Sequence, residues 1–172
     1  VRLRLSIYGS RKEEAEKRIE TEITALKGIL GDIIYSETDD TLEGCIGRLL
    51  AQNGKTLSTA ESCTGGTISA LITSIAGSSA YFLGSVTSYA NSVKEGVLGV
   101  PAEIIEEFGA VSSECVGAMA EGVRKLTGTD FSVATSGIAG PGGGSAEKPV
   151  GLVWIGVSSQ MGTETFSLRF KV

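Results

Sequence analysis

The stretch TLSTAESCTGG, residues 56–66, indicates the fold class of this chain, because it passes from a strand pattern to a helix pattern within a few residues. Residues 56–60 form a run that predicts a strand. Gly65 and Gly66 then open a helix whose apolar side chains recur at helical spacing. These apolar positions are Ile68, Leu71, Ile72 and Ile75. A strand that turns directly into a helix is the building unit of a layered α/β domain.

The same alternation continues beyond this stretch. Further strands are predicted at residues 84–90, 131–137, 151–159 and 164–170. Helices are predicted at residues 42–50, 91–98, 101–108 and 112–126. We therefore expect an α/β fold, a layered α/β/α domain with a central mixed sheet, over residues 39–172.

Residues 1–38 predict a small separate segment. Residues 2–8 alternate in polarity, which indicates a strand, and a helical pattern of apolar residues follows. Residues 33–35 suggest a second short strand, so we expect a β-α-β appendage. The polar break SETDD at residues 36–40 places the boundary between the appendage, 1–38, and the larger domain, 39–172.

Composition excludes several classes of protein. The net charge of −5 and the pI near 4.9 disfavour a nucleic-acid partner or an anionic membrane surface. There is no apolar run long enough for a membrane span and no signal-peptide pattern. The three cysteines are widely spaced without a CxxC pair, which argues against a zinc site or a disulfide framework. We expect a cytoplasmic protein, and the start at Val1 suggests a fragment or a processed product.

The absence of histidine restricts any covalent mechanism. Ser62 and Cys63 are the candidate nucleophiles, and a base has to be a lysine, a tyrosine or a carboxylate. Ser62 lies at the expected strand-to-helix turn, where amides from around Thr64 to Gly66 can form an oxyanion hole. The alternative is that Ser62 or Thr64 only caps the helix.

Four separate segments resemble one known family. AESCTGG (60–66), FLGSVTSYANSVKEGVLGV (82–100), GAVSSE (109–114) and SGIAGPGGGSAEKPVG (136–151) are similar to the C-terminal domain of the CinA family, which resembles nicotinamide-nucleotide amidohydrolase. Residues 1–36 are similar to the KH-like linker domain of longer members. The resemblance implies that nicotinamide mononucleotide (NMN) is hydrolysed to nicotinate mononucleotide and ammonia, in pyridine nucleotide recycling. It implies a homodimer and requires no metal or cofactor.

The resemblance also implies a catalytic group of Ser62, Tyr89 and Lys94. Ser62 attacks the carboxamide, and Lys94, directly or through Tyr89, accepts its proton. We expect Ser62 Oγ within one hydrogen bond or one bridging water of Lys94 or Tyr89. Cys63 is expected to point off the turn into packing.

The glycine loop at residues 139–149 is the candidate phosphate site, because its amides and a nearby lysine can bind an anion. The end of strand 131–137 can meet the ribose or the carboxamide. The expected substrate-binding residues are Thr64, Gly65, Gly66, Thr135, Ser136, Gly137, Gly140, Gly142, Gly143, Gly144 and Lys148. The alternative for the loop is a plain mobile connection.

A second function remains open from the sequence. The chain could be a non-catalytic nucleotide-binding or regulatory module, with its KH-like segment contacting RNA or another partner. The acidic charge and the lack of a GxxG loop in residues 1–36 weaken the RNA version.

Overall fold

The computed structural model describes residues 3–9 and 11–171, and the chain divides into two units, residues 1–45 and 46–172. The first unit contains helix α1 (Lys12–Leu30), the 3-10 turn η1 (Gly31–Ile33) and the start of α2 (Leu42–Gln52). No residue of α1 is buried within this chain. An ion pair of 2.6 Å joins Lys27 to Glu37 and ties the end of α1 to the segment that follows it.

The β-α-β prediction for the first unit is wrong in its strands. Residues 3–8 have no regular structure, residues 31–33 form η1, and residue 2 lies outside the described residues. A strand is stable only when its backbone groups pair with a neighbour and one face is covered. The alternation at residues 3–7 supplies apolar side chains, but Leu3 and Leu5 remain exposed, so the segment finds no such cover.

The second unit is built on one five-stranded sheet. Its strands are β1 (Leu57–Glu61), β2 (Phe82–Thr87), β3 (Phe131–Gly137), β4 (Leu152–Ser159) and β5 (Gly162–Arg169). The strand order is β2-β1-β3-β4-β5. The central strand β1 pairs in parallel with β2 and β3, whereas β3, β4 and β5 pair antiparallel. The expected mixed sheet is therefore confirmed.

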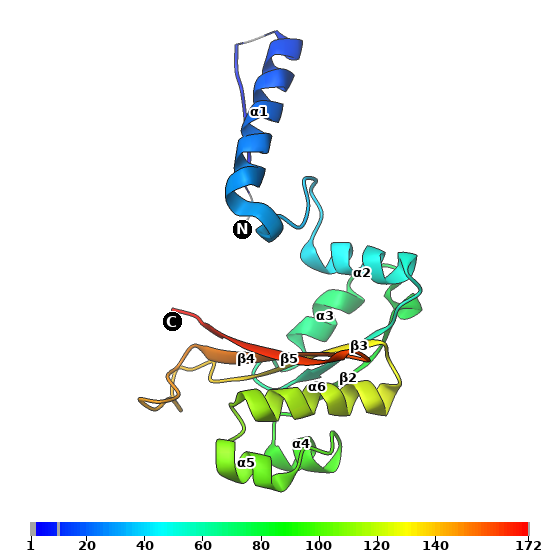
Figure 1. Cartoon of the computed structure of the whole chain (residues 1–172), viewed down its shortest axis with the longest axis vertical. Helices are drawn as coiled ribbons and strands as arrows, with labels where there is room; N and C mark the ends of the chain where they lie inside the picture. The colour runs from blue at the N-terminus through cyan, green and yellow to red at the C-terminus, as the bar shows by residue number, and fades with distance from the viewer. Residues whose placement is uncertain (1–2, 10, 172) are drawn as a thin grey trace. The chain divides into compact units, whose positions relative to one another are not determined.

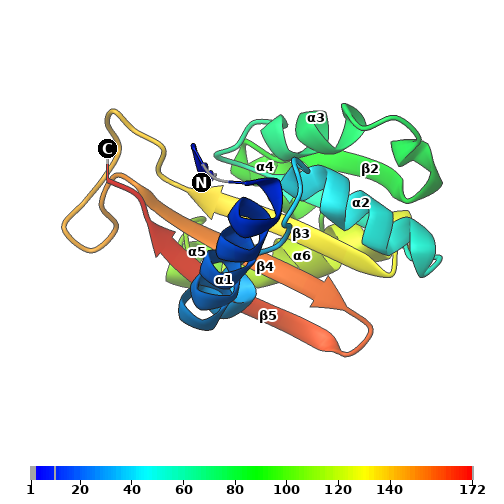
Figure 2. The same ribbon diagram turned by 90° about the horizontal axis from the view of Figure 1, so that it is seen from above.

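Helices cover both faces of this sheet (Figure 1). Helix α6 (Ser113–Thr127) packs on one face, next to α4 (Asn91–Gly96) and α5 (Ala102–Phe108), and α3 (Thr67–Thr73) packs on the other. Figure 2 shows β3, β4 and β5 side by side with α6 beneath them. The α/β/α layering predicted from the alternation of strands and helices is confirmed.

Helix α6 forms the main core with the inner strands. Ser112 caps it, since its Oγ accepts a hydrogen bond of 3.1 Å from the amide of Cys115. Close approach to β4 depends on Gly156, where a Cβ atom would lie 2.7 Å from the carbonyl oxygen of Val116. The helix buries one face against Ala60 of β1 and Ala134 of β3. Its buried residues are Cys115, Val116, Gly117, Met119, Ala120 and Val123.

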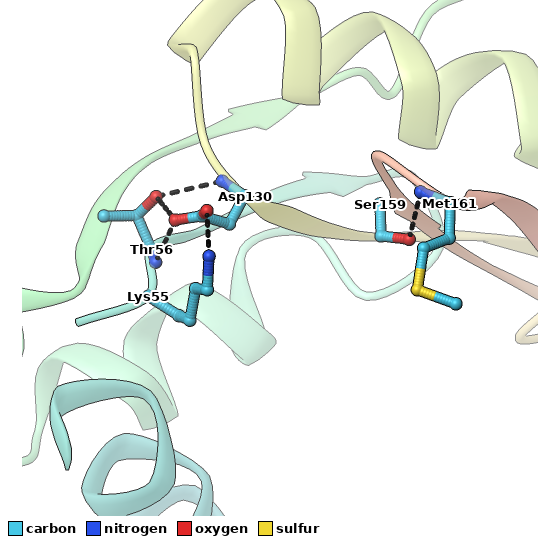
Figure 3. A network of polar contacts seen from close by, with 5 residues as sticks. All are labelled: Lys55, Thr56, Asp130, Ser159 and Met161. Carbon is cyan, nitrogen blue, oxygen red and sulfur yellow. Dashed lines mark hydrogen bonds and ion pairs between the residues drawn. The ribbon is translucent and has the colours of Figure 1, made fainter. Parts of the chain in front are cut away.

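The amino ends of β1 and β3 are fastened by Asp130 (Figure 3). Its carboxylate accepts hydrogen bonds of 2.9 Å from the amide and hydroxyl of Thr56 and from Lys55 Nζ. Thr56 Oγ1 accepts a further bond from the Asp130 amide. Figure 3 also shows the β4–β5 turn, where Ser159 Oγ accepts from the Met161 amide. Because β1 and β3 are parallel, their carboxyl ends lie next to each other at the other end of the strands.

No helix in the described part of the chain is both long and apolar enough to cross a membrane.

Candidate active site

A pocket of about 270 Å³ lies where β1 and β3 end. Open α/β sheets commonly bind ligands at this edge, since loops from parallel strands converge there. The pocket is lined by Ser62, Tyr89 and Lys94 together, although these residues come from three different segments of the chain. The end of β3 and the segment after it contribute Ser136, Gly137, Ile138, Ala139, Gly140 and Gly142 to the lining.

The backbone of Ser62 is fixed on two sides. Its amide donates a hydrogen bond of 3.0 Å to the carbonyl oxygen of Thr135, which continues the β1–β3 ladder by one residue. Its carbonyl oxygen accepts a bond of 3.1 Å from Gly65, so the chain reverses immediately after the strand. Gly65 has a φ of 60°, a conformation that glycine adopts without strain. Ser62 is 9% exposed and lines the pocket.

The amides of the turn are used differently from the sequence prediction. The Gly66 amide donates to the carboxylate of Glu61 at 3.1 Å, and the Gly65 amide donates to Ser62. Gly65 and Gly66 therefore do not offer free amides to a ligand. Within the described residues, the amides of Cys63 and Thr64 donate to no backbone carbonyl oxygen.

Lys94 is buried although it carries an amine. It stands on α4, is 1% exposed, and its Nζ donates to the carbonyl oxygens of Ser88 at 2.7 Å and of Tyr89 at 3.2 Å. Among the described residues no carboxylate pairs with it. Burial lowers the pKa of Lys94, and the nearby thiols of Cys115 and Cys63 oppose that shift only in part.

In the described part of the chain no direct hydrogen bond joins Ser62 to Lys94 or Tyr89, and Lys94 Nζ donates to two carbonyl oxygens. A bridging water between Ser62 and one of these groups stays a prediction. Tyr89 lines the pocket and, as a residue, is 76% exposed.

The end of β3 contributes hydroxyl groups beside the pocket. Thr135 Oγ1 and Thr64 Oγ1 share a hydrogen bond of 2.8 Å, and neither residue lines the pocket. Ser136 lines it, and its Oγ donates to the carbonyl oxygen of Ala110 at 2.6 Å. This bond holds the segment after α5 against the pocket, where Ala110 and Val111 form part of the lining.

Only part of the glycine loop faces the pocket. Figure 2 shows this loop projecting beyond the end of β3. Gly140 and Gly142 line the pocket, whereas Gly143 and Gly144 do not. Lys148 also points elsewhere than the sequence predicts, since its Nζ donates to the carbonyl oxygen of Phe108 at the end of α5. A cation at this position satisfies a free carbonyl group of the helix terminus.

Three neighbours of the site were missed or misplaced by the sequence analysis. Cys63 lines the pocket instead of packing away from it, and Asn91 lines it as well. Burial raises the pKa of the Cys63 thiol, and the negative charge of Glu61 raises it further. Glu61 is fully buried beside the nucleophile candidate. Its signal in the sequence was a carboxylate at the end of an otherwise uncharged strand.

The residues described by the structure include no cluster of three or more histidine, cysteine, aspartate or glutamate side chains placed to hold a metal ion.

Comparison with known proteins gives a consistent picture. The family model of the CinA C-terminal domain matches residues 39–172. A CinA-like protein of Parasynechococcus marenigrum is 49% identical over 170 residues, which cover 99% of this chain and 41% of the relative. A CinA-like protein of Dictyoglomus turgidum is 50% identical over 155 residues, 90% of this chain and 38% of the relative. This chain thus spans about two fifths of their length.

Solved structures show the same fold. The competence/damage inducible protein CihA from Agrobacterium tumefaciens superimposes with a TM-score of 0.71 at 40% identity, over 79% of this chain and 86% of that one. A competence-damaged protein (CinA) superfamily protein from Enterobacter cloacae superimposes with a TM-score of 0.73 at 32% identity, over 81% and 84%.

Proposed function

The chain belongs to the CinA family, and from this membership we propose that it is an amidohydrolase that converts NMN and water into nicotinate mononucleotide and ammonia. The observation that carries the proposal is the buried amine of Lys94, without a carboxylate partner in the described chain, in the pocket that Ser62 lines. A lysine whose pKa is lowered by burial can act as the base that a serine nucleophile needs where histidine is absent.

In the first half of the reaction Ser62 Oγ forms a bond to the carboxamide carbon of NMN. Neutral Lys94 takes the hydroxyl proton through a bridging water, and the electron pair of the C=O π bond moves onto oxygen. The oxyanion accepts hydrogen bonds from the amides of Cys63 and Thr64, which donate to no backbone carbonyl oxygen in the described residues. When the C=O bond re-forms, the C–N bond breaks and ammonia leaves with a proton from the Lys94 ammonium.

In the second half water hydrolyses the acyl-enzyme. Neutral Lys94 accepts a proton from the attacking water, whose oxygen bonds to the acyl carbon. The bond to Ser62 Oγ then breaks, and the oxygen recovers a proton from Lys94. The product carboxylic acid loses its proton to the solvent, nicotinate mononucleotide leaves as the carboxylate, and the enzyme returns to its starting state. Tyr89, at the exposed side of the pocket, assists the proton transfers and covers the pyridine ring.

Substrate binding follows from the remaining lining. The phosphate lies at Gly140 and Gly142, which line the pocket and carry no side chain that would keep a ligand from their backbone. Ser136 meets the ribose, because its oxygen keeps an acceptor position after donating to Ala110. The amino end of α3 is not the phosphate site, since Glu61 already occupies its amides.

The deciding experiment measures ammonia released from NMN by this chain, with the Ser62→Ala variant as the control for contamination. Release by the wild type and not by the variant supports the proposal. Binding of NMN without release of ammonia contradicts it and favours the non-catalytic nucleotide-binding module instead.

A further inference from the structure

We propose that Glu61 is the positioning residue of the nucleophile turn, residues 62–66, and that its carboxylate holds Ser62 in the pocket from inside the fold. The inference rests on the proposed function, which makes Ser62 the nucleophile. It assigns a role in the reaction to a side chain that does not line the pocket.

The carboxylate of Glu61 binds three backbone amides of the turn and of the start of α3. Oε2 accepts hydrogen bonds from Gly66 at 3.1 Å and from Ile68 at 3.0 Å, and Oε1 accepts from Ser69 at 2.8 Å. The first amides of a helix lack partners within the helix, so an acceptor at this place fixes where the helix begins. Ser62 lies between the backbone of Glu61 and the amides that its side chain holds.

The backbone of Glu61 is itself anchored to the sheet. Its carbonyl oxygen accepts a hydrogen bond of 2.8 Å from the amide of Ser88, the residue that follows β2. Glu61 also lies in register between Thr87 of β2 and Thr135 of β3. The fully buried side chain of Glu61 therefore links the central strand to the turn, so that the turn keeps a fixed position relative to the sheet.

The charge of Glu61 has a separate effect on the neighbouring thiol. Burial by itself raises the pKa of Glu61, but hydrogen bonds from the Ser69 amide, the Thr64 hydroxyl and the Ile68 amide outweigh it, so the pKa is lowered and the group is ionised at neutral pH. Ser62 and Cys63 both line the pocket. The anion beside Cys63 disfavours the thiolate, which leaves Ser62 as the nucleophile.

Two variants separate these effects. Glu61→Gln keeps the length of the side chain but removes the charge and places an NH2 group against an amide. Glu61→Asp keeps the charge but shortens the reach to Ile68 and Ser69. Glu103→Gln is the matched control, because Glu103 is an exposed acidic residue in the first turn of α5.

For NMN hydrolysis we expect kcat to fall about tenfold or more in both Glu61 variants, with KM changed less than about threefold, because the nucleophile is misplaced while the binding loop is intact. For alkylation of Cys63 we expect the pH midpoint to move down by on the order of one unit in Glu61→Gln and to stay in Glu61→Asp. A loss of stability alone does not move this midpoint. Glu103→Gln should match the wild type in both measurements.

If Glu61→Gln and Glu61→Asp both fold and keep the wild-type kcat, the positioning role of Glu61 is overturned. If the pH midpoint of Cys63 alkylation is unchanged in Glu61→Gln, the proposed effect of the Glu61 charge is overturned. Should Glu61→Gln fail to fold, Glu61→Asp carries the kinetic test. If even the wild type releases no ammonia from NMN, the proposed function fails, and amide hydrogen exchange then decides about Glu61. Faster exchange at Ile68 and Ser69 in Glu61→Asp supports the positioning role, and unchanged exchange refutes it.

Discussion

Lys94 Nζ lies 2.7 Å from the carbonyl oxygen of Ser88, in a position that is closed to solvent. The amide of the same Ser88 donates to the carbonyl oxygen of Glu61, which directly precedes Ser62. Ser88, the residue after β2, therefore binds both parts of the proposed site. Its carbonyl oxygen accepts from Lys94, the proposed base, and its amide donates to the residue that precedes Ser62, the proposed nucleophile. The two groups are far apart in the sequence, but a single peptide segment sets their separation.

The first prediction concerns the pH dependence of catalysis. Because Lys94 has to be neutral to act as base, kcat/KM for NMN should rise with pH through the pKa of Lys94, and the midpoint should lie below the usual 10.5. Lys94→Met should lower kcat by roughly a thousandfold. A pH–rate profile of the wild type checks the midpoint, and a midpoint at or above 10.5 contradicts the role of burial.

Because the pKa of Lys94 is lowered in the folded chain, we also expect the free energy of unfolding to depend on pH. The folded-state pKa of Lys94 is below the unfolded value, so the unfolded chain binds the extra proton, and stability should rise as pH increases from the lowered pKa toward 10.5. Lys94→Met should lack this contribution. Urea unfolding of both proteins at a series of pH values measures the difference, and parallel curves would show that Lys94 is not perturbed.

Ser62 and Cys63 can be separated by substitution. Ser62→Ala should lower kcat on the order of a thousandfold or more, whereas Cys63→Ala should keep activity within about tenfold. The reason is that burial and Glu61 keep the Cys63 thiol protonated. Steady-state kinetics of both variants decide the matter. An inactive Cys63→Ala beside an active Ser62→Ala, with NMN protecting the native enzyme from iodoacetamide, would reverse the assignment.

Gly142 tests the phosphate site. A Cβ atom at Gly142 meets nothing within 4 Å, and its φ is not positive, so Gly142→Val should fold normally. Because Gly142 lines the pocket, we expect the added side chain to reduce the space for the phosphate and to raise KM for NMN on the order of tenfold, with a smaller effect on kcat. Gly28→Val, at an equally open position on α1, is the control. Unchanged kinetics would place the phosphate elsewhere.

We expect the hydrogen bonds of Asp130, which link β1 to β3, to weaken in acid. The Lys55 ammonium and the Thr56 amide and hydroxyl lower its pKa to about 2. Since the folded pKa lies below the unfolded one, this stabilisation is present above about pH 4 and is lost as pH falls toward 2. Asp130→Asn should therefore melt at a lower temperature than the wild type at pH 7, and the difference should shrink below pH 4. The exposed Asp32→Asn should show no such difference, and a pH-independent gap would contradict the electrostatic origin.

The order of strands and helices in the larger domain could be predicted from the pattern of apolar and polar residues. Residues 131–137 form a strand as expected, and α6 spans Ser113–Thr127 where a helix over 112–126 is predicted. These features depend on side-chain periodicity and capping within a few residues, so they can be read locally. The resemblance of four segments to one family can also be seen in the sequence. It implies that Ser62, Tyr89 and Lys94 act together, and in the structure all three line the same pocket.

Which backbone and side-chain groups remain free to bind a ligand, in contrast, depends on contacts between distant segments. The Gly66 amide is bound by Glu61, Lys148 donates to Phe108, and Lys94 donates to Ser88. Each of these hydrogen bonds forms because the fold brings donor and acceptor within about 3 Å of each other. The separation of the two residues in the sequence does not predict that they will meet. The unpaired residues 3–8 show the same limit, because an alternating pattern becomes a strand only when a neighbouring strand takes up its backbone groups.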